Sequence, residues 1–202
     1  MAIVFSFVFP FFLVTALLQV GALWFGMDLR GWRPALIVGF ISAGITMIPV
    51  GGLPLARWLI SFTANFSIPL TAILLAKVLD AFFNIRLLDE KAYLTCWVCS
   101  IIAGTLLYPM AMGLSRFDPY SAGWGFSWLF VLTFSVTMVL LIMKNRFAGV
   151  LIAVILAYNL RLLESTNLWD YLIDPFLVAV SFIALGLRLF KGLLKKAPRS
   201  EG

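Results

Sequence analysis

Histidine is absent from this sequence of 202 residues. Its imidazole is the side chain that most often transfers protons near neutral pH and binds transition metals, so histidine-based catalysis and most transition-metal sites are excluded. The phosphate-binding pattern G-x-x-x-x-G-K-[ST] and the glycine-rich dinucleotide-binding pattern are also missing. The sequence therefore predicts neither a cofactor nor a bound metal.

The two cysteines, Cys96 and Cys99, are too few for a disulfide scaffold and lie inside an apolar block. Their C-x-x-C spacing is found in redox sites, but no activating base stands nearby and the surrounding sequence is apolar. We interpret both as small hydrophobic residues of a helix.

Charged residues are also scarce, at 12%, whereas hydrophobic residues make up 63% of the chain. Soluble domains contain about 45–50% apolar residues, so this chain has too few polar groups to cover its surface in water. Its apolar residues come in blocks of roughly 17–23, the length that crosses a hydrocarbon core of about 30 Å. Backbone polar groups in lipid must pair within the chain, which favours helices. The sequence predicts an all-α integral membrane protein.

The blocks predict a single domain over residues 1–202, a compact bundle of about seven transmembrane helices. The expected spans are residues 3–25, 35–50, 57–79, 92–113, 124–143, 147–163 and 171–190, followed by a basic tail over residues 191–202. The second block is short, so whether it crosses the bilayer fully stays open.

Basic residues are distributed unevenly along this threading. Arg57, Arg116 and Arg161 fall on one side, and the other twelve of the fifteen basic residues fall on the side of the C-terminus. Because basic residues collect on the cytoplasmic side, we expect the N-terminus outside and the C-terminus in the cytoplasm. The net charge of +6 has the same explanation, so no nucleic acid is expected as a partner. Short connectors favour a bacterial cytoplasmic (inner) membrane.

Residues 158–175 are the densest group of polar and ionisable side chains between the two ends of the chain, and they fall on the outer side of the threading. With two other connectors they form a candidate site that we name the outer polar cluster. Its members are Arg57, Asp118, Arg161, Glu164, Asn167, Asp170 and Asp174.

Spacing suggests how these residues interact. Arg161 and Glu164 are three apart and can pair on one helical face, whereas Asp170 and Asp174 are four apart and repel each other unless something compensates them. A structural interpretation has Asp170 capping the last span and Arg161 tying the last two spans together. A functional interpretation has a polar pocket, completed by Asn65, that binds a head group, a cation or a partner's loop. A catalytic pair of carboxylates is a third interpretation.

A few polar residues lie within the predicted spans, at Gln19, Asn65 and Asn159. In the third block, Thr63, Ser67 and Thr71 recur every four residues on one helical face. Such residues are typical of hydrogen bonds between helices, although they also line substrate paths.

The leading hypothesis is a non-catalytic polytopic membrane subunit that positions or supports a partner in a cell-envelope biosynthesis or transport system. Its partners are the lipid bilayer and either another membrane protein or a second copy of the chain. One alternative is a small transporter or substrate-binding membrane component that uses Gln19, Asn65, Asn159 and Arg161. The other is an enzyme on lipid-linked substrates, with Asp118, Glu164, Asp170 or Asp174 as base or metal ligand.

Overall fold

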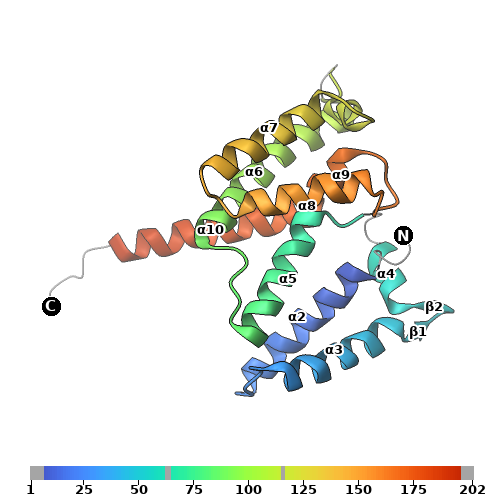
Figure 1. The fold of residues 1–202 in the computed structure, drawn as a ribbon, viewed down its shortest axis with the longest axis vertical. Helices are drawn as coiled ribbons and strands as arrows, with labels where there is room; N and C mark the ends of the chain where they lie inside the picture. Colours follow the sequence, from blue (N-terminus) through green and yellow to red (C-terminus); the bar gives the residue numbers. More distant parts are fainter. Residues whose placement is uncertain (1–6, 62–64, 115–116, 197–202) are drawn as a thin grey trace.

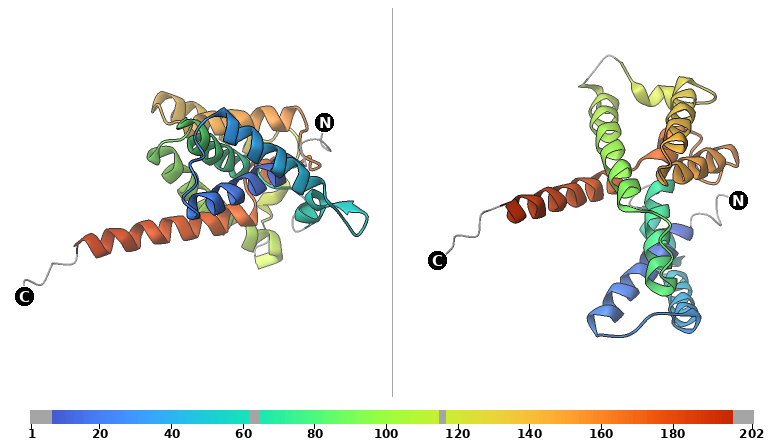
Figure 2. Two further views of the ribbon diagram at one scale, coloured as in Figure 1. Left: turned by 90° about the horizontal axis from the view of Figure 1, so that it is seen from below. Right: turned by 60° about the vertical axis from the view of Figure 1, so that its left-hand side comes forward.

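The computed structural model describes residues 7–61, 65–114 and 117–196, with side chains described as far as Gly192. Over these residues the chain is a bundle of helices with one short hairpin (Figure 1), which confirms the predicted all-helical bundle. The sequence predicted a compact bundle, but helix α10 projects beyond the other helices toward the C-terminus (Figures 1 and 2).

The elements follow the apolar blocks. The helices are α2 (Val8–Trp24), α3 (Trp32–Met47), α4 (Leu55–Ser61), α5 (Ile68–Phe83), α6 (Glu90–Pro109), α7 (Trp128–Ile142), α8 (Phe147–Asn159), α9 (Leu168–Leu172) and α10 (Pro175–Lys196). A π-helical turn, η1 (Met110–Leu114), and a 3-10 turn, η2 (Pro119–Gly123), lie between α6 and α7. Strands β1 (Pro49–Val50) and β2 (Leu53–Pro54) pair antiparallel around Gly51 and Gly52, whose positive φ angles suit a two-residue turn.

The predicted third span, residues 57–79, is not one continuous helix. Helix α4 ends at Ser61 and α5 begins at Ile68, with Ser67 extended between them. The Ser67 hydroxyl accepts a hydrogen bond from the Leu70 amide, and Pro69 occupies the first turn of α5. Because proline suits the start of a helix, Pro69 begins a helix here instead of kinking one. Thr63 of the predicted polar stripe lies outside the described residues.

The last predicted span, residues 171–190, is also interrupted. Helix α9 ends at Leu172, Ile173 is extended, and α10 starts at Pro175. Asp170 therefore lies in α9, whereas Asp174 lies between α9 and α10, so the predicted like-charge pair on one helical face is absent.

Two segments of the described chain, Glu90–Leu114 and Leu168–Gly192, are long and apolar enough to cross a membrane. Helices α2, α3, α7 and α8 are apolar but shorter. Helix α8 has 13 residues, which at about 1.5 Å per residue makes about 20 Å, less than a hydrocarbon core of about 30 Å. The number of spans stays a prediction.

The helices pack in neighbouring pairs around α5. Helix α2 packs on α3 and α5, α5 on α8, α8 on α7, and α6 on α10. The rings of Phe9 and Phe66 stack with centroids 3.6 Å apart in the largest core. Where α6 meets α10, a Cβ atom on Gly104 would stand 2.6 Å from a methyl group of Val178, so this close approach requires glycine.

Candidate functional site

The connectors between helices gather into two groups. In the first group, β-bridge pairing joins Trp124 to Asn167, and a hydrogen bond joins the Ser67 amide to Asp174. In the second group, the Gly31 amide donates to the Phe82 carbonyl at 2.8 Å, and the Arg146 guanidinium donates to the Arg86 carbonyl. The first group contains the outer polar cluster, and the second contains the connectors predicted for the cytoplasmic side.

Asp174 joins two helix starts and is 2% exposed. Its Oδ1 accepts from the Leu177 amide at 2.9 Å in the first turn of α10. Its Oδ2 accepts from the Ser67 amide at 2.9 Å, immediately before α5. Since both oxygens accept backbone N–H groups that would otherwise be buried without a partner, Asp174 acts as a cap and as a tie between α5 and α10.

Asn167 is fully buried and ties α9 to η2. Its Oδ1 caps α9 by accepting from the Trp169 amide at 3.0 Å, and its Nδ2 donates to the Tyr120 carbonyl at 3.0 Å. Gly123 leaves the space for this side chain, because a Cβ atom there would stand 1.7 Å from the Asn167 Oδ1.

Asp170 lies in α9 and accepts from the Tyr120 hydroxyl at 3.0 Å. Burial, together with the negative charge of Asp170, raises the pKa of Tyr120 to about 12. The Tyr120 hydroxyl therefore keeps its proton, and its hydrogen bond to Asp170, well above neutral pH. Asp118 caps η2 by accepting from the Tyr120 amide at 2.9 Å, so two carboxylates hold this turn.

Glu164 pairs with Arg57 of α4, with the guanidinium and carboxylate 3.6 Å apart. Its own amide donates to the Asn65 Oδ1 at 3.1 Å. Helix α8 ends at Asn159, and Arg161 adopts the left-handed conformation with φ 50°. The predicted helical spacing of Arg161 and Glu164 is therefore absent, and Arg161 stays exposed at the rim of the cluster.

A cavity of about 360 Å³ adjoins the outer polar cluster and includes Asp170 and Asp174 in its wall. Asn65, Tyr108, Tyr120, Asp170 and Asp174 contribute polar side chains to its wall, and Leu107 and Ile173 contribute apolar ones. Within the described chain, every buried side-chain nitrogen or oxygen has a hydrogen-bond partner. The same residues hold no group of three His, Cys, Asp or Glu side chains placed to bind a metal ion.

The other predicted intramembrane residues do not join this cavity. Gln19 is buried and donates to the Val78 carbonyl at 3.3 Å, linking α2 to α5. Asn159 is exposed and donates to the Ile155 carbonyl of its own helix at 2.8 Å.

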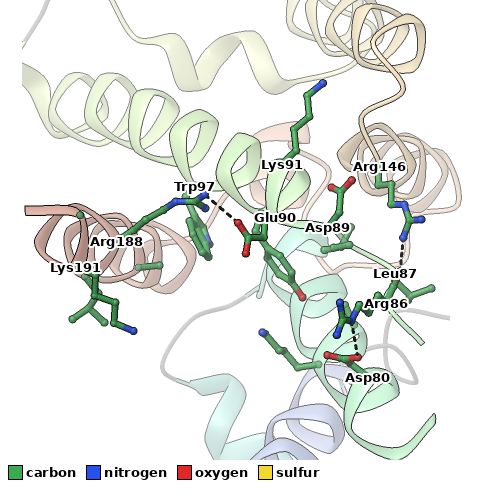
Figure 3. A pocket seen from close by; sticks show the side chains of 17 residues that line it. Asp80, Arg86, Leu87, Asp89, Glu90, Lys91, Trp97, Arg146, Arg188 and Lys191 are labelled. Carbon is green, nitrogen blue, oxygen red and sulfur yellow. Dashed lines mark hydrogen bonds and ion pairs between the residues drawn. The ribbon is translucent and has the colours of Figure 1, made fainter. Parts of the chain in front are cut away.

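A second cavity, which the sequence did not predict, lies among the connectors of the second group (Figure 3). It has a volume of about 1340 Å³ and is bounded by the end of α5, the following connector, the start of α6 and one face of α10. We name it the basic groove after six side chains in its wall: Lys77, Arg86, Lys91, Arg146, Arg188 and Lys191.

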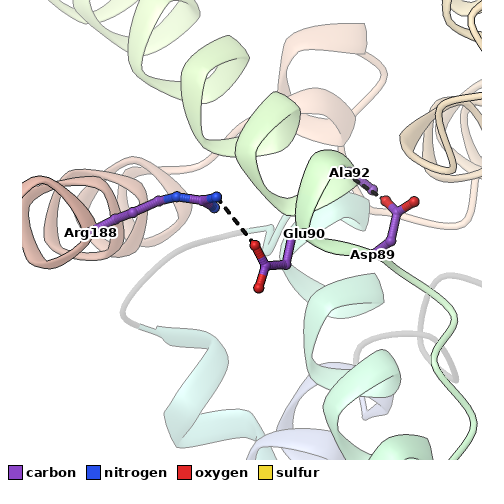
Figure 4. Close-up of polar contacts among 4 residues, drawn as sticks. All are labelled: Asp89, Glu90, Ala92 and Arg188. Atoms are coloured by element: carbon purple, nitrogen blue, oxygen red, sulfur yellow. Dashed lines mark hydrogen bonds and ion pairs between the residues drawn. The ribbon is translucent and has the colours of Figure 1, made fainter. Parts of the chain in front are cut away.

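Three carboxylates also line the basic groove, and each has a local partner. Asp80 pairs with Arg86 at 3.8 Å, and Glu90 of α6 pairs with Arg188 of α10 at 3.3 Å (Figure 4). Asp89 caps α6 by accepting from the Ala92 amide at 2.8 Å (Figure 4). The polar stretch between α5 and α6 was the only sign of this site in the sequence.

No family model, curated protein or solved structure matches this chain. The inferences that follow rest on its own residues.

Proposed function

We propose that the chain is an integral membrane protein of about seven spans, with its N-terminus outside and its C-terminus in the cytoplasm. In this proposal it is a non-catalytic subunit of a cell-envelope biosynthesis or transport system in a bacterial inner membrane. Its role is to hold a partner, either another membrane protein or a second copy of the chain.

The grouping of the connectors supports this topology. An odd number of crossings places alternate connectors on opposite sides, and the pairings Trp124–Asn167, Gly31–Phe82 and Arg146–Arg86 each join segments of the same predicted side. Exposed aromatic side chains stand near both groups, with Trp24 89% exposed at the end of α2 and Phe126 83% exposed just before α7. Aromatic residues at two opposite ends of a bundle are typical of the two membrane interfaces.

One observation carries the non-catalytic role: the buried and partly buried members of the outer polar cluster form hydrogen bonds that hold the chain together. Asp174, Asn167 and Asp170 accept or donate the hydrogen bonds that fix α9, α10 and η2. A catalytic base needs its lone pair directed at a substrate, whereas both oxygens of Asp174 face backbone amides.

Both basic members of the cluster stay at the surface. Arg57 forms a half-exposed ion pair with Glu164, and Arg161 is exposed three residues before Glu164 in the chain. Charged groups at a rim select partners and orient them, so these three residues are the proposed contact for a partner's loop.

The short helices support association as well. Helices α7 and α8 have 15 and 13 residues, and a span shorter than the hydrocarbon core is accommodated by bilayer thinning or by oligomerisation. Large apolar side chains are exposed on these and other helices, for example Phe40 at 76% and Ile142 at 82%. Lipid and a partner together would cover them.

Topology is tested by single cysteines in a background where Cys96 and Cys99 are alanine. Ser121→Cys should react with a membrane-impermeant maleimide in intact cells, whereas Lys144→Cys should react only after the membrane is opened. Equal reaction of both positions in intact cells would refute the topology.

The partner is tested by cross-linking and gentle extraction from native membranes, followed by mass spectrometry. Arg57→Gln, Arg161→Gln and Glu164→Gln are combined in one variant, and Lys144→Gln is the matched control. The proposal expects a protein, or a differently tagged copy of the chain, that is retained by the control and lost by the combined variant. A chain that is recovered alone from all three samples would refute it.

A further inference from the structure

We propose that the basic groove binds the phosphate headgroup of an anionic phospholipid. The groove combines three features that such a ligand requires: an excess of positive charge, cationic groups without a carboxylate partner, and an apolar surface beside them. On the proposed topology, on which this inference rests, it opens at the cytoplasmic leaflet.

The excess charge follows from the residues in the wall. The wall of the basic groove contains six basic side chains and three carboxylates, which gives it a net charge of +3. Half of the twelve basic residues predicted for the cytoplasmic side are therefore gathered in one cavity, although they come from three separate stretches of the chain: residues 77–91, Arg146 and residues 188–191. The positive-inside rule accounts for their side of the membrane but gives no reason for this convergence.

The partners of these basic groups differ in kind. Lys77 stands over the ring of Tyr93, 5.0 Å from its centroid, and Arg146 donates to a backbone carbonyl. Lys91 and Lys191 are exposed, and neither forms an ion pair within the described part of the chain. Because Lys91 lies in the first turn of α6, the helix dipole disfavours its charge, so its position is better explained by an anion than by the helix.

Arg188 can also turn to an anion. It pairs with Glu90, whose side chain is 89% exposed, and such solvent-exposed ion pairs contribute little because water screens both charges. A phosphate, which accepts hydrogen bonds from a guanidinium in two places, competes well with a carboxylate in this setting. Figure 3 shows Arg188 of α10 directed at Glu90 of α6, with Trp97 of α6 close to this pair and Lys191 on the same helix as Arg188.

An apolar surface continues from the charged wall along α10. Leu187 lines the groove and is 55% exposed, and Ile183 and Phe190 on the same helix are 62% and 59% exposed. A free phosphate makes no use of this surface, whereas the acyl chains of a lipid cover it. Basic pockets between membrane helices on the cytoplasmic side suit anionic headgroups for this reason.

The test is native mass spectrometry of the full chain in detergent, titrated with phosphatidylglycerol or with phosphatidylcholine of the same acyl chains. The variant is Lys91→Gln with Lys191→Gln, and the control is Lys144→Gln, which removes an exposed positive charge outside the groove. A second variant, Lys91→Arg with Lys191→Arg, keeps the charge and shows whether the double substitution acts through charge.

Wild type, the control and the arginine variant should prefer phosphatidylglycerol to phosphatidylcholine. The glutamine variant should bind phosphatidylglycerol about 30-fold more weakly, which corresponds to about 1 kcal/mol for each lysine. Equal affinity of the glutamine variant and wild type would overturn the proposal, and so would an equal loss in the control or equal affinity for the two lipids.

Inorganic phosphate and glycerol 3-phosphate are added as competitors to separate the sources of phosphate. If neither competitor displaces phosphatidylglycerol at an equal concentration, the lipid proposal is supported. If either competitor displaces it at that concentration, the proposal is overturned. Failure of the topology is distinguished by Lys144→Cys: if this cysteine reacts in intact cells, the proposed orientation is wrong, while lipid binding in detergent is still measured.

Discussion

Replacing Asp174 with alanine should destabilise the protein more than removing any other carboxylate of the outer polar cluster. The substitution removes the cap of α10, which typically contributes about 0.5–2 kcal/mol. It also leaves the buried Ser67 amide without its acceptor, which costs about 1–3 kcal/mol. Since Asp174 is 2% exposed, water does not replace it easily. We expect a total loss of about 2–4 kcal/mol in the free energy of unfolding.

Two further variants sharpen this prediction. Asp174→Asn keeps the shape but offers one acceptor oxygen to two backbone amides, so it should lose about 1–3 kcal/mol. Asp118→Ala removes an exposed cap of η2, and water can replace it as acceptor for the Tyr120 amide, so the variant should lose less than about 1 kcal/mol.

The measurement is unfolding by an increasing fraction of SDS in mixed micelles, followed by tryptophan fluorescence. If Asp174→Ala and Asp118→Ala differ by less than about 0.5 kcal/mol, the usual range of surface substitutions, the tie between α5 and α10 does not contribute as described.

Three further predictions concern close packing and pH. Gly123→Ala should lose about 1–3 kcal/mol in the same assay, because its Cβ would displace Asn167. Gly104→Ala should destabilise the contact of α6 with Val178 of α10. Gly149→Ala, with nothing within 4 Å of its Cβ, should be neutral or stabilising by up to about 1 kcal/mol. If Gly149→Ala lowered the free energy of unfolding more than Gly104→Ala, the described packing of α6 on α10 would be contradicted. The raised pKa of Tyr120 favours its protonated form in the folded state, so its stabilisation is complete below pH 10 and is lost as the pH rises to about 12. Wild type should therefore lose stability relative to Tyr120→Phe over that interval, and parallel pH profiles would contradict the bond to Asp170.

Residues 158–175 and the turn η2 were both predicted for one side of the membrane, so their proximity could be anticipated, whereas Ser67 fell inside a predicted span. Residues 158–175 do meet the segment before α5 and the turn η2, as shown by the bonds of Asp174 to Ser67 and of Asn167 to Tyr120. The individual partners were not predictable. Spacing on an uninterrupted helix suggested that Glu164 pairs with Arg161, but α8 ends at Asn159 and Glu164 meets Arg57, more than one hundred positions earlier in the chain.

Helix ends were harder to predict than helices, because hydropathy does not distinguish a helical apolar residue from an extended one. Pro69 illustrates this: it lies inside one continuous predicted span, whereas the extended Ser67 ends the connector before it and Pro69 stands in the first turn of α5. The basic groove was missed for a related reason. Its residues each stood at the end of a predicted span, where the positive-inside rule already explained them, and only the packing of α10 against the start of α6 brings them together.

The two ends of the bundle use their polar residues differently, and this difference bears on function. In the outer polar cluster, buried carboxylates and amides accept backbone hydrogen bonds, so substituting them changes the fold. In the basic groove, exposed lysines and a half-exposed arginine line a cavity, so substituting them should change what the cavity attracts. A chain that fixes one end by internal hydrogen bonds and leaves positive charge open at the other fits the proposal that anionic lipid binds the basic groove. Under the two proposals together, lipid would occupy one end, and Arg57, Arg161 and Glu164 at the other would contact a partner.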